Sequence, residues 1–144
     1  MHKSTTAVLD PVTLYRILAL RVDVFVVEQQ CPYPELDGRD LDRETVHFWI
    51  SDDDGDVLAT LRLLRDDLPG GDWEYRIGRV CTAEAARGRG LTAQLMRAAL
   101  DEIGTRASVL DAQSHLVDMY ERFGYRVSGP EFLEDGIAHT PMRR

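Results

Sequence analysis

The segment from Val80 to Thr92, with the sequence VCTAEAARGRGLT, combines residue types that suit the binding of an anion. Gly88 and Gly90 allow the backbone to approach a ligand closely. A helical pattern follows them, so unpaired backbone N–H groups and the positive end of a helix dipole face this loop. Arg87 and Arg89 add formal positive charge. The segment therefore predicts a pyrophosphate-binding loop between a strand and a helix, rather than a glycine-rich turn with exposed arginines.

The loop lacks the motifs of nucleoside triphosphatases and dinucleotide dehydrogenases. It contains no GxxxxGK[ST] sequence, and Ala93 stands where a GxGxxG motif would have its third glycine. The segment instead resembles the [QR]-x-x-G-x-[GA] motif of GNAT-family N-acetyltransferases, with Arg87, Gly90 and Thr92 at the specified positions. Thr92 departs from the glycine or alanine that is usual in the family.

Three further segments extend this resemblance over most of the chain from about residue 14. QSHLVDMYERFGY resembles the second acetyl-CoA segment of the family, with Gln113 in place of the usual asparagine, then Tyr120 and a closing Gly124-Tyr125. Residues 24–42 and 132–139 resemble the ElaA-like subgroup. The resemblance implies an α/β fold with a GNAT-like mixed central sheet, acting on acetyl-CoA as co-substrate and requiring no metal.

The resemblance also implies where acetyl-CoA binds. The strand before the loop would splay from its neighbour, and the pantetheine arm would pair with the backbone of Val80, Cys81 and Thr82. A backbone N–H near Cys81 would stabilise the oxyanion. Gln113 would hold the pantetheine or the acceptor. The pyrophosphate would lie on the loop formed by Arg87, Gly88, Arg89, Gly90, Leu91 and Thr92.

Tyr120 has two interpretations. Its helical spacing with Leu116, Met119 and Phe123 is typical of a core tyrosine. The resemblance implies instead that Tyr120 protonates the departing CoA thiolate, a role that suits a phenol protonated at neutral pH.

A primary amine acceptor must lose a proton before it attacks the thioester, which requires a base or a water chain. Glu28, at the end of the first helix, and His139, in the late ElaA-like motif, are the candidates; a solvated glutamate and a structural histidine are their alternatives. We interpret His47 and His115 as structural or surface residues. The acceptor itself is open among a small polyamine, an amino sugar, a peptide N-terminus and a protein lysine.

The two cysteines, Cys31 and Cys81, form no CxxC or Cys/His cluster. We expect reduced thiols and a cytoplasmic protein. An acetyl-enzyme intermediate on Cys81 is less favoured than a buried small side chain, because no activating histidine lies near it in the sequence.

Hydrophobic periodicity predicts the elements that position these residues. Asp10-Pro11 predicts the start of a helix over residues 11–28, with Arg21 as the odd member of its apolar stripe. An acidic loop follows over residues 30–45, either attracting cationic amines or forming a solvated face. Residues 46–82 predict a three-stranded antiparallel meander, with Asp52–Gly55 as a turn rather than a metal loop.

The second half predicts strands alternating with two helices. The first helix ends at Gly104, and the second is capped by Ser114 and ends at Gly124. The strands are expected over residues 107–112, 125–127 and 137–142.

The 144 residues predict a single domain, and the resemblance implies that residues 1–144 form one N-acetyltransferase domain. The net charge of −8 argues against nucleic acid as a partner. No apolar run is long enough to cross a membrane or to serve as a signal peptide. The alternative function is a non-catalytic acyl-CoA-binding or sensing module on the same fold. Acetylation of aminoacyl groups on tRNA is disfavoured by the charge, and a homodimer is open.

Overall fold

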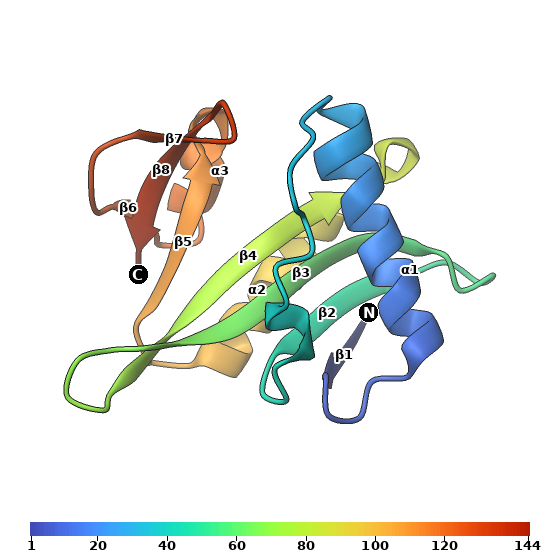
Figure 1. The fold of residues 1–144 in the computed structure, drawn as a ribbon, viewed down its shortest axis with the longest axis horizontal. Coiled ribbons are helices and arrows are strands. Elements are labelled where there is room, and N and C mark those ends of the chain that lie inside the picture. Colours follow the sequence, from blue (N-terminus) through green and yellow to red (C-terminus); the bar gives the residue numbers. More distant parts are fainter.

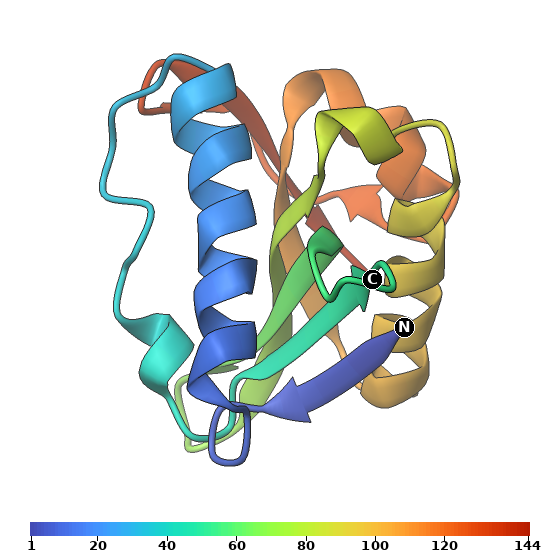
Figure 2. The same ribbon diagram turned by 90° about the vertical axis from the view of Figure 1, so that its right-hand side faces the viewer.

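The computed structural model describes residues 1–144. Its eight strands are β1 (His2–Thr5), β2 (Val46–Ser51), β3 (Val57–Asp67), β4 (Trp73–Thr82), β5 (Ser108–Gln113), β6 (Arg126–Val127), β7 (Phe132–Glu134) and β8 (Ile137–Arg143). They form one sheet in the order β1-β2-β3-β4-β5-β8-β6, with β7 paired to β8 (Figure 1). Its three α-helices are α1 (Pro11–Val22), α2 (Leu91–Ile103) and α3 (Val117–Glu121). Figure 2 shows α1 on one face of the sheet and α2 and α3 on the other. The predicted mixed α/β sheet is confirmed.

The first helix begins where the sequence predicts. The side chain of Asp10 accepts a hydrogen bond from the backbone N–H of Thr13 at 2.9 Å, and Pro11 occupies the first turn. The predicted helix over residues 11–28 is confirmed, although its last turn, Asp23–Glu28, is π-helical. None of the helices combines the length and apolar character needed to cross a membrane.

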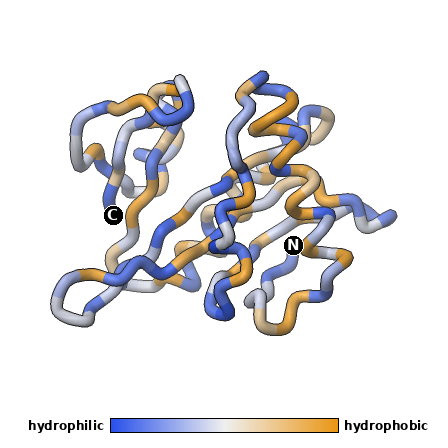
Figure 3. Tube along the Cα trace, in the orientation of Figure 1, coloured by the Kyte–Doolittle hydropathy of each residue, from blue (hydrophilic) through white to orange (hydrophobic).

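The antiparallel part of the sheet has one strand more than the sequence predicts. β1 pairs with β2 along its whole length, and the ring of His2 stacks on Trp49 with centroids 5.4 Å apart. An edge strand of four partly exposed residues carries no apolar alternation, which is why the pattern did not reveal it. The acidic turn at Asp52 is confirmed: its carboxylate accepts from the N–H groups of Asp54 and Asp56, and Figure 3 shows this turn as hydrophilic.

The elements after α2 differ in detail from the prediction. α2 does end at Gly104, but the expected cap at Ser114 is wrong. The hydroxyl of Ser114 lies 2.8 Å from that of Thr140 in β8, and a 3₁₀ turn over Ser114–Leu116 precedes the short α3. Strand β7 was also not predicted, because its three residues are all exposed.

Most of the core lies between the sheet and helices α2 and α3. Its fully buried members include Phe48, Leu61, Leu95, Met96 and Met142. A smaller apolar cluster lies under α1, where Ile17, Leu20 and Val24 meet Val57 and Cys81. The middle strands are therefore covered by apolar side chains on both faces.

The loop after α1 is anchored by buried charge at Glu35 and Asp40, which corrects the expectation of a solvated or cation-attracting face for these two residues, whereas Asp42 and Glu44 are exposed. Arg21, 1% exposed, places Nε 2.5 Å from Oε1 of Glu35 and Nη1 2.6 Å from Oδ1 of Asp40. Arg62 and Arg79 pair with the carboxylates of this loop as well. The odd arginine of the apolar stripe is therefore a counter-ion for two buried carboxylates of the loop, since a buried charge must be paired.

Candidate active site

A cleft opens where β4 and β5 diverge. The two parallel strands pair only at Tyr75–Ser108 and Arg76–Val109, and beyond these pairs they separate (Figure 1). β4 contains one extra residue at this point, since the β3–β4 register shifts between Thr60 and Arg62. Arg79, in the bulge, has a φ of +54°, a conformation that non-glycine residues rarely adopt. The expected splay of the strand is confirmed.

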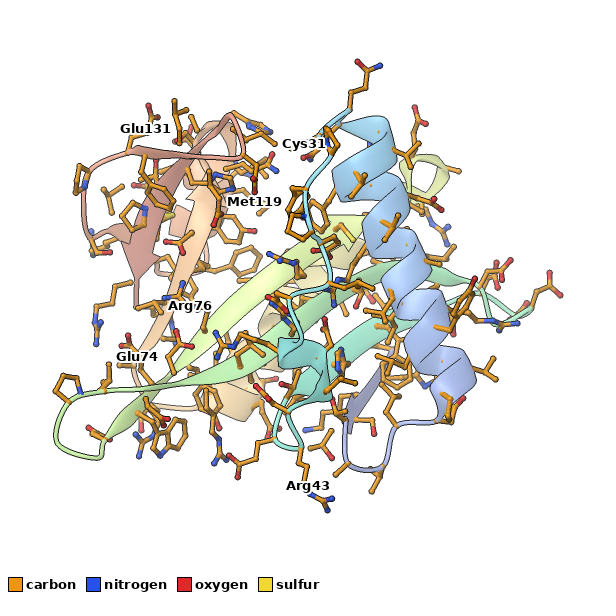
Figure 4. All side chains as sticks on the ribbon, in the orientation of Figure 1. Cys31, Arg43, Glu74, Arg76, Met119 and Glu131 are labelled. Atoms are coloured by element: carbon orange, nitrogen blue, oxygen red, sulfur yellow. The ribbon has the colours of Figure 1, made fainter.

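The gap between the strands forms a cavity of about 890 Å³ that receives residues from both faces of the sheet. Arg62 and Arg76 line it on the α1 side, and Met119 and Tyr120 of α3 line it on the other. In Figure 4, Cys31 and Met119 lie on opposite sides of the opening, and Arg76 lies toward the closed end. The cavity therefore passes through the sheet.

The predicted pantetheine strand borders this cavity. Val80, Cys81 and Thr82 all line it, and no residue of β4 beyond Arg76 pairs with β5. Backbone groups on this edge of β4 are therefore open to pairing with an extended ligand.

Cys81 is 6% exposed and packs against α1. Burial raises the pKa of its thiol to about 12. A thiol with this pKa is not a thiolate at neutral pH, so the expectation of a buried small side chain agrees with its environment. Both Cys31 and Cys81 are free.

The predicted pyrophosphate loop lines a second cavity, of about 490 Å³. Of the predicted residues it receives Arg87, Gly88, Gly90, Leu91 and Thr92, whereas Arg89 lines neither cavity. Gly90 precedes α2 with a φ of +72°, and no side chain caps the helix, so its first N–H groups lack a side-chain partner. The helix dipole adds positive potential there.

The two cavities are joined by shared residues. Thr82, Arg87, Thr92 and Met119 line both of them. The departure of Thr92 from the family motif has a local explanation, because its hydroxyl lies 3.0 Å from that of Thr82. The hydroxyl is thus directed to the neighbouring strand.

Arg87 and the candidate base Glu28 are brought together. Nη2 of Arg87 lies 2.6 Å from Oε2 of Glu28, and Nε of Arg87 donates to the carbonyl oxygen of Thr82. The hydrogen bond from Arg87 lowers the pKa of the Glu28 carboxyl. This pairing makes Glu28 a weaker base than the sequence suggested.

Tyr120 belongs to the core and to the cleft at once. It is 6% exposed and packs edge-on against Tyr125, with ring centroids 6.5 Å apart. It also lines the larger cavity, and its hydroxyl forms no hydrogen bond within the chain. Burial raises the pKa of its phenol above the ordinary value, so the group keeps its proton.

His139 and Gln113 face each other in the register of β8 and β5, and both line the larger cavity. Nδ1 of His139 lies 2.8 Å from the carbonyl oxygen of Ile137. Because a carbonyl oxygen only accepts, Nδ1 carries the hydrogen and Nε2 of the neutral ring is the basic nitrogen. His139 also stacks on Phe132.

Gln113 reaches across the cleft to a residue that sequence reasoning missed. Its Nε2 donates to Oε1 of Gln29 at 3.2 Å, and Sγ of Cys31 lies 3.4 Å from the carbonyl oxygen of Asp135. These two contacts join the segment that follows the π-helical turn to β5 and to the turn between β7 and β8, across the cleft. No local pattern could have indicated them, because each joins residues more than eighty positions apart.

Sequence reasoning also missed Arg97 and Arg122 in the smaller cavity. Arg97 lies six residues after Leu91, on the exposed face of α2. A positive charge on the helix that follows the predicted anion loop is the only signal in the sequence that could have indicated it. No group of three or more histidine, cysteine, aspartate or glutamate side chains is arranged to hold a metal ion.

Comparison with known proteins agrees with this geometry. The model of the acetyltransferase (GNAT) domain matches residues 20–144. The chain is 54% identical to the UPF0039 protein Rv2851c of Mycobacterium tuberculosis, covering 94% of this chain and 86% of that protein. It is 39% identical to protein ElaA of Escherichia coli, covering 91% of this chain and 86% of ElaA. The crystal structure of an acyl-CoA N-acyltransferase from Pseudomonas aeruginosa superposes with a TM-score of 0.90 at 43% identity, over 99% of this chain and 97% of that one. The chain therefore belongs to the GNAT acetyltransferase family, with ElaA among its homologues, and its fold supports acyl transfer from CoA.

Proposed function

We propose that this protein transfers an acetyl group from acetyl-CoA to a primary amine by direct attack within a ternary complex. One observation carries the proposal. A continuous pair of cavities joins a helix N-terminus flanked by arginine to a through-sheet cleft that contains both Tyr120 and His139. An anion-binding end, an open strand edge and an acid–base pair are what acyl transfer from a diphosphate-bearing thioester requires.

In this proposal the backbone groups of Val80, Cys81 and Thr82 bind the extended arm of the co-substrate along the open edge of β4. The α2 N-terminus, with Arg87 and Gly90, binds the diphosphate. A backbone N–H near Cys81 donates to the thioester oxygen and stabilises the negative charge that develops on it.

His139 then accepts a proton from the acceptor ammonium through its basic Nε2. The freed nitrogen lone pair forms a C–N bond to the thioester carbon, giving a tetrahedral oxyanion. Collapse of this intermediate breaks the C–S bond, and Tyr120 donates its phenolic proton to the CoA thiolate. The nitrogen loses its second proton to the Tyr120 phenolate, directly or through water, and His139 releases the proton that it took to solvent. The products are therefore the N-acetylated amine, free CoA and one proton.

We favour His139 over Glu28 as the base because of their different partners. Glu28 is paired with Arg87, whereas Nε2 of His139 has no partner within the chain. Free thiols at Cys31 and Cys81 support a cytoplasmic site of action.

The proposal is tested by calorimetric titration with acetyl-CoA, followed by a CoA-release assay over small diamines, amino sugars and lysine-containing peptides. We expect binding in the micromolar range or tighter and turnover with at least one class of primary amine. Absence of binding at tens of micromolar would contradict the assignment. Binding without turnover over the whole panel would favour the acyl-CoA-sensing alternative.

A further inference from the structure

The arginines that line the two cavities differ in whether they are neutralised. In the larger cavity every arginine is paired with a carboxylate. Arg97 and Arg122, in the smaller cavity, form no ion pair and no hydrogen bond within the chain. In a protein with a net charge of −8, unpaired arginines that share a concave site indicate a ligand that supplies negative charge.

The two arginines reach this cavity from positions other than the N-terminus of α2. Arg97 lies six residues along α2 from Leu91, which corresponds to about 9 Å along the helix axis. Arg122 follows α3 and approaches the cavity from a different element. The cavity therefore receives positive charge from the helix N-terminus with Arg87, from Arg97 farther along α2, and from Arg122 after α3.

This arrangement matches a ligand that has two separate phosphate groups. CoA has a diphosphate and, across its ribose, a 3′-phosphate. Phe123 is partly buried in the same cavity, next in sequence to Arg122, and provides an aromatic surface beside the charged groups. A phosphopantetheine arm attached to a carrier protein has neither the second phosphate nor the nucleotide.

We propose that Arg97 and Arg122 bind the 3′-phosphate of CoA and thereby select free CoA thioesters over ligands that lack this phosphate. The inference rests on the proposed function, since it assigns residues to the nucleotide end of the same co-substrate. Each arginine forms charge-assisted hydrogen bonds to the phosphate, and these are among the stronger polar contacts of proteins.

The test compares the dissociation constants of CoA and 3′-dephospho-CoA by calorimetry. The proteins are the unmodified chain, Arg97→Gln, Arg122→Gln, the double variant, and the control Arg126→Gln. Arg126 is an exposed arginine on β6 that forms no ion pair and lines neither cavity. Because Arg97 and Arg122 have no partner within the chain, circular dichroism and thermal melting are expected to stay unchanged in every variant.

We expect the unmodified chain to bind CoA at least about tenfold more tightly than dephospho-CoA. Each single variant should lose a large part of this preference and the double variant nearly all of it, while affinity for dephospho-CoA stays constant. Equal weakening of both ligands would overturn the proposal and place the arginines on the diphosphate. Unchanged affinities would also overturn it. If the unmodified chain binds neither ligand, the proposed function itself fails, which is a distinguishable result.

Discussion

Arg87 in the loop before α2 and Glu28 at the end of the π-helical turn form an ion pair across the mouth of the cleft, with Nη2 and Oε2 2.6 Å apart. Arg87 is the residue proposed to bind the diphosphate, and Glu28 is one of the two candidate bases that the sequence predicts. Both side chains are about two-fifths exposed, so solvent screens the attraction and a stronger anion can displace the carboxylate. A bound diphosphate and Glu28 would compete for Arg87.

Glu28→Gln should therefore tighten acetyl-CoA binding by about twofold to fivefold, because Arg87 is released from its partner. Turnover should stay within a factor of about five of the unmodified enzyme, since His139 is the proposed base. Calorimetry and a CoA-release assay measure the two effects, with Glu121→Gln, an exposed glutamate of α3, as the matched control. A collapse of turnover by two orders of magnitude or more would make Glu28 the base instead.

Tyr120→Phe should leave acetyl-CoA affinity within about twofold and lower kcat by about 100-fold or more, the range typical of a lost general acid. Its hydroxyl forms no hydrogen bond in the fold, so stability should change little. Tyr125→Phe is the control: its hydroxyl lies 2.7 Å from that of Ser108, and its loss should lower stability without a selective effect on kcat. Because burial raises the pKa of Tyr120, we expect no loss of kcat on the alkaline side below about pH 10. An unchanged kcat in Tyr120→Phe would remove the proposed role.

His139→Gln should reduce kcat about 100-fold at neutral pH, where the acceptor is an ammonium and needs a base. The deficit should shrink as the pH approaches the pKa of the amine itself, because a free amine needs no deprotonation. A pH profile of kcat with one amine measures this convergence, with His115→Gln as a control histidine that also lines the cleft. A deficit that is constant over the whole pH range would point to a structural role for His139.

Arg21→Leu should lower the free energy of unfolding by about 3 kcal/mol. Glu35 and Asp40 would keep only Arg79 and Arg62 as partners, so the cluster would hold one buried negative charge in excess. Denaturant unfolding measures the loss. Arg65→Leu, which removes the exposed pair with Glu44, should cost no more than about 1 kcal/mol. Adding Asp40→Asn to Arg21→Leu should recover part of the stability, because Glu35 keeps Arg79 and Arg62 keeps Asp37. Failure of this double variant to recover any would argue against excess charge as the cause.

Low pH should reduce the stability that the ion pairs of Asp37 and Asp40 give to the fold. Arg62 holds the pKa of Asp37 below its usual value against the opposing effect of burial, and Arg21 does the same for Asp40. Folding lowers the pKa of these carboxyls from the value of 3.8 that they have in the unfolded chain. Each carboxylate therefore stabilises the fold at pH values above 3.8, and this contribution is lost as the pH falls toward and through the lower pKa of the folded state. We expect the free energy of unfolding to decline below about pH 4, and to decline less steeply in Asp37→Asn. An identical decline in that variant would assign acid unfolding to other groups.

The chain's local patterns predicted the elements and much of the cleft. Helical and alternating periodicity located α1, α2 and the main strands, because burial of one face imposes a repeat on the sequence. The glycines and arginines of the loop before α2 indicated an anion site, since a helix N-terminus and nearby positive charge are local properties. Tyr120 was found through its position in a motif. Elements too short to show a repeat, such as β1, β7 and α3, were missed or misplaced.

Only the tertiary structure decided which charges meet. The sequence placed Glu28 at a helix end, but its pairing with Arg87 joins residues 59 positions apart. Arg21 looked anomalous on an apolar stripe, and only packing brought it to Glu35 and Asp40. Arg97 and Arg122 share a cavity because α2 and α3 cover the same face of the sheet. Local sequence governs backbone conformation, whereas ion pairing depends on distances that exist only once the layers have packed.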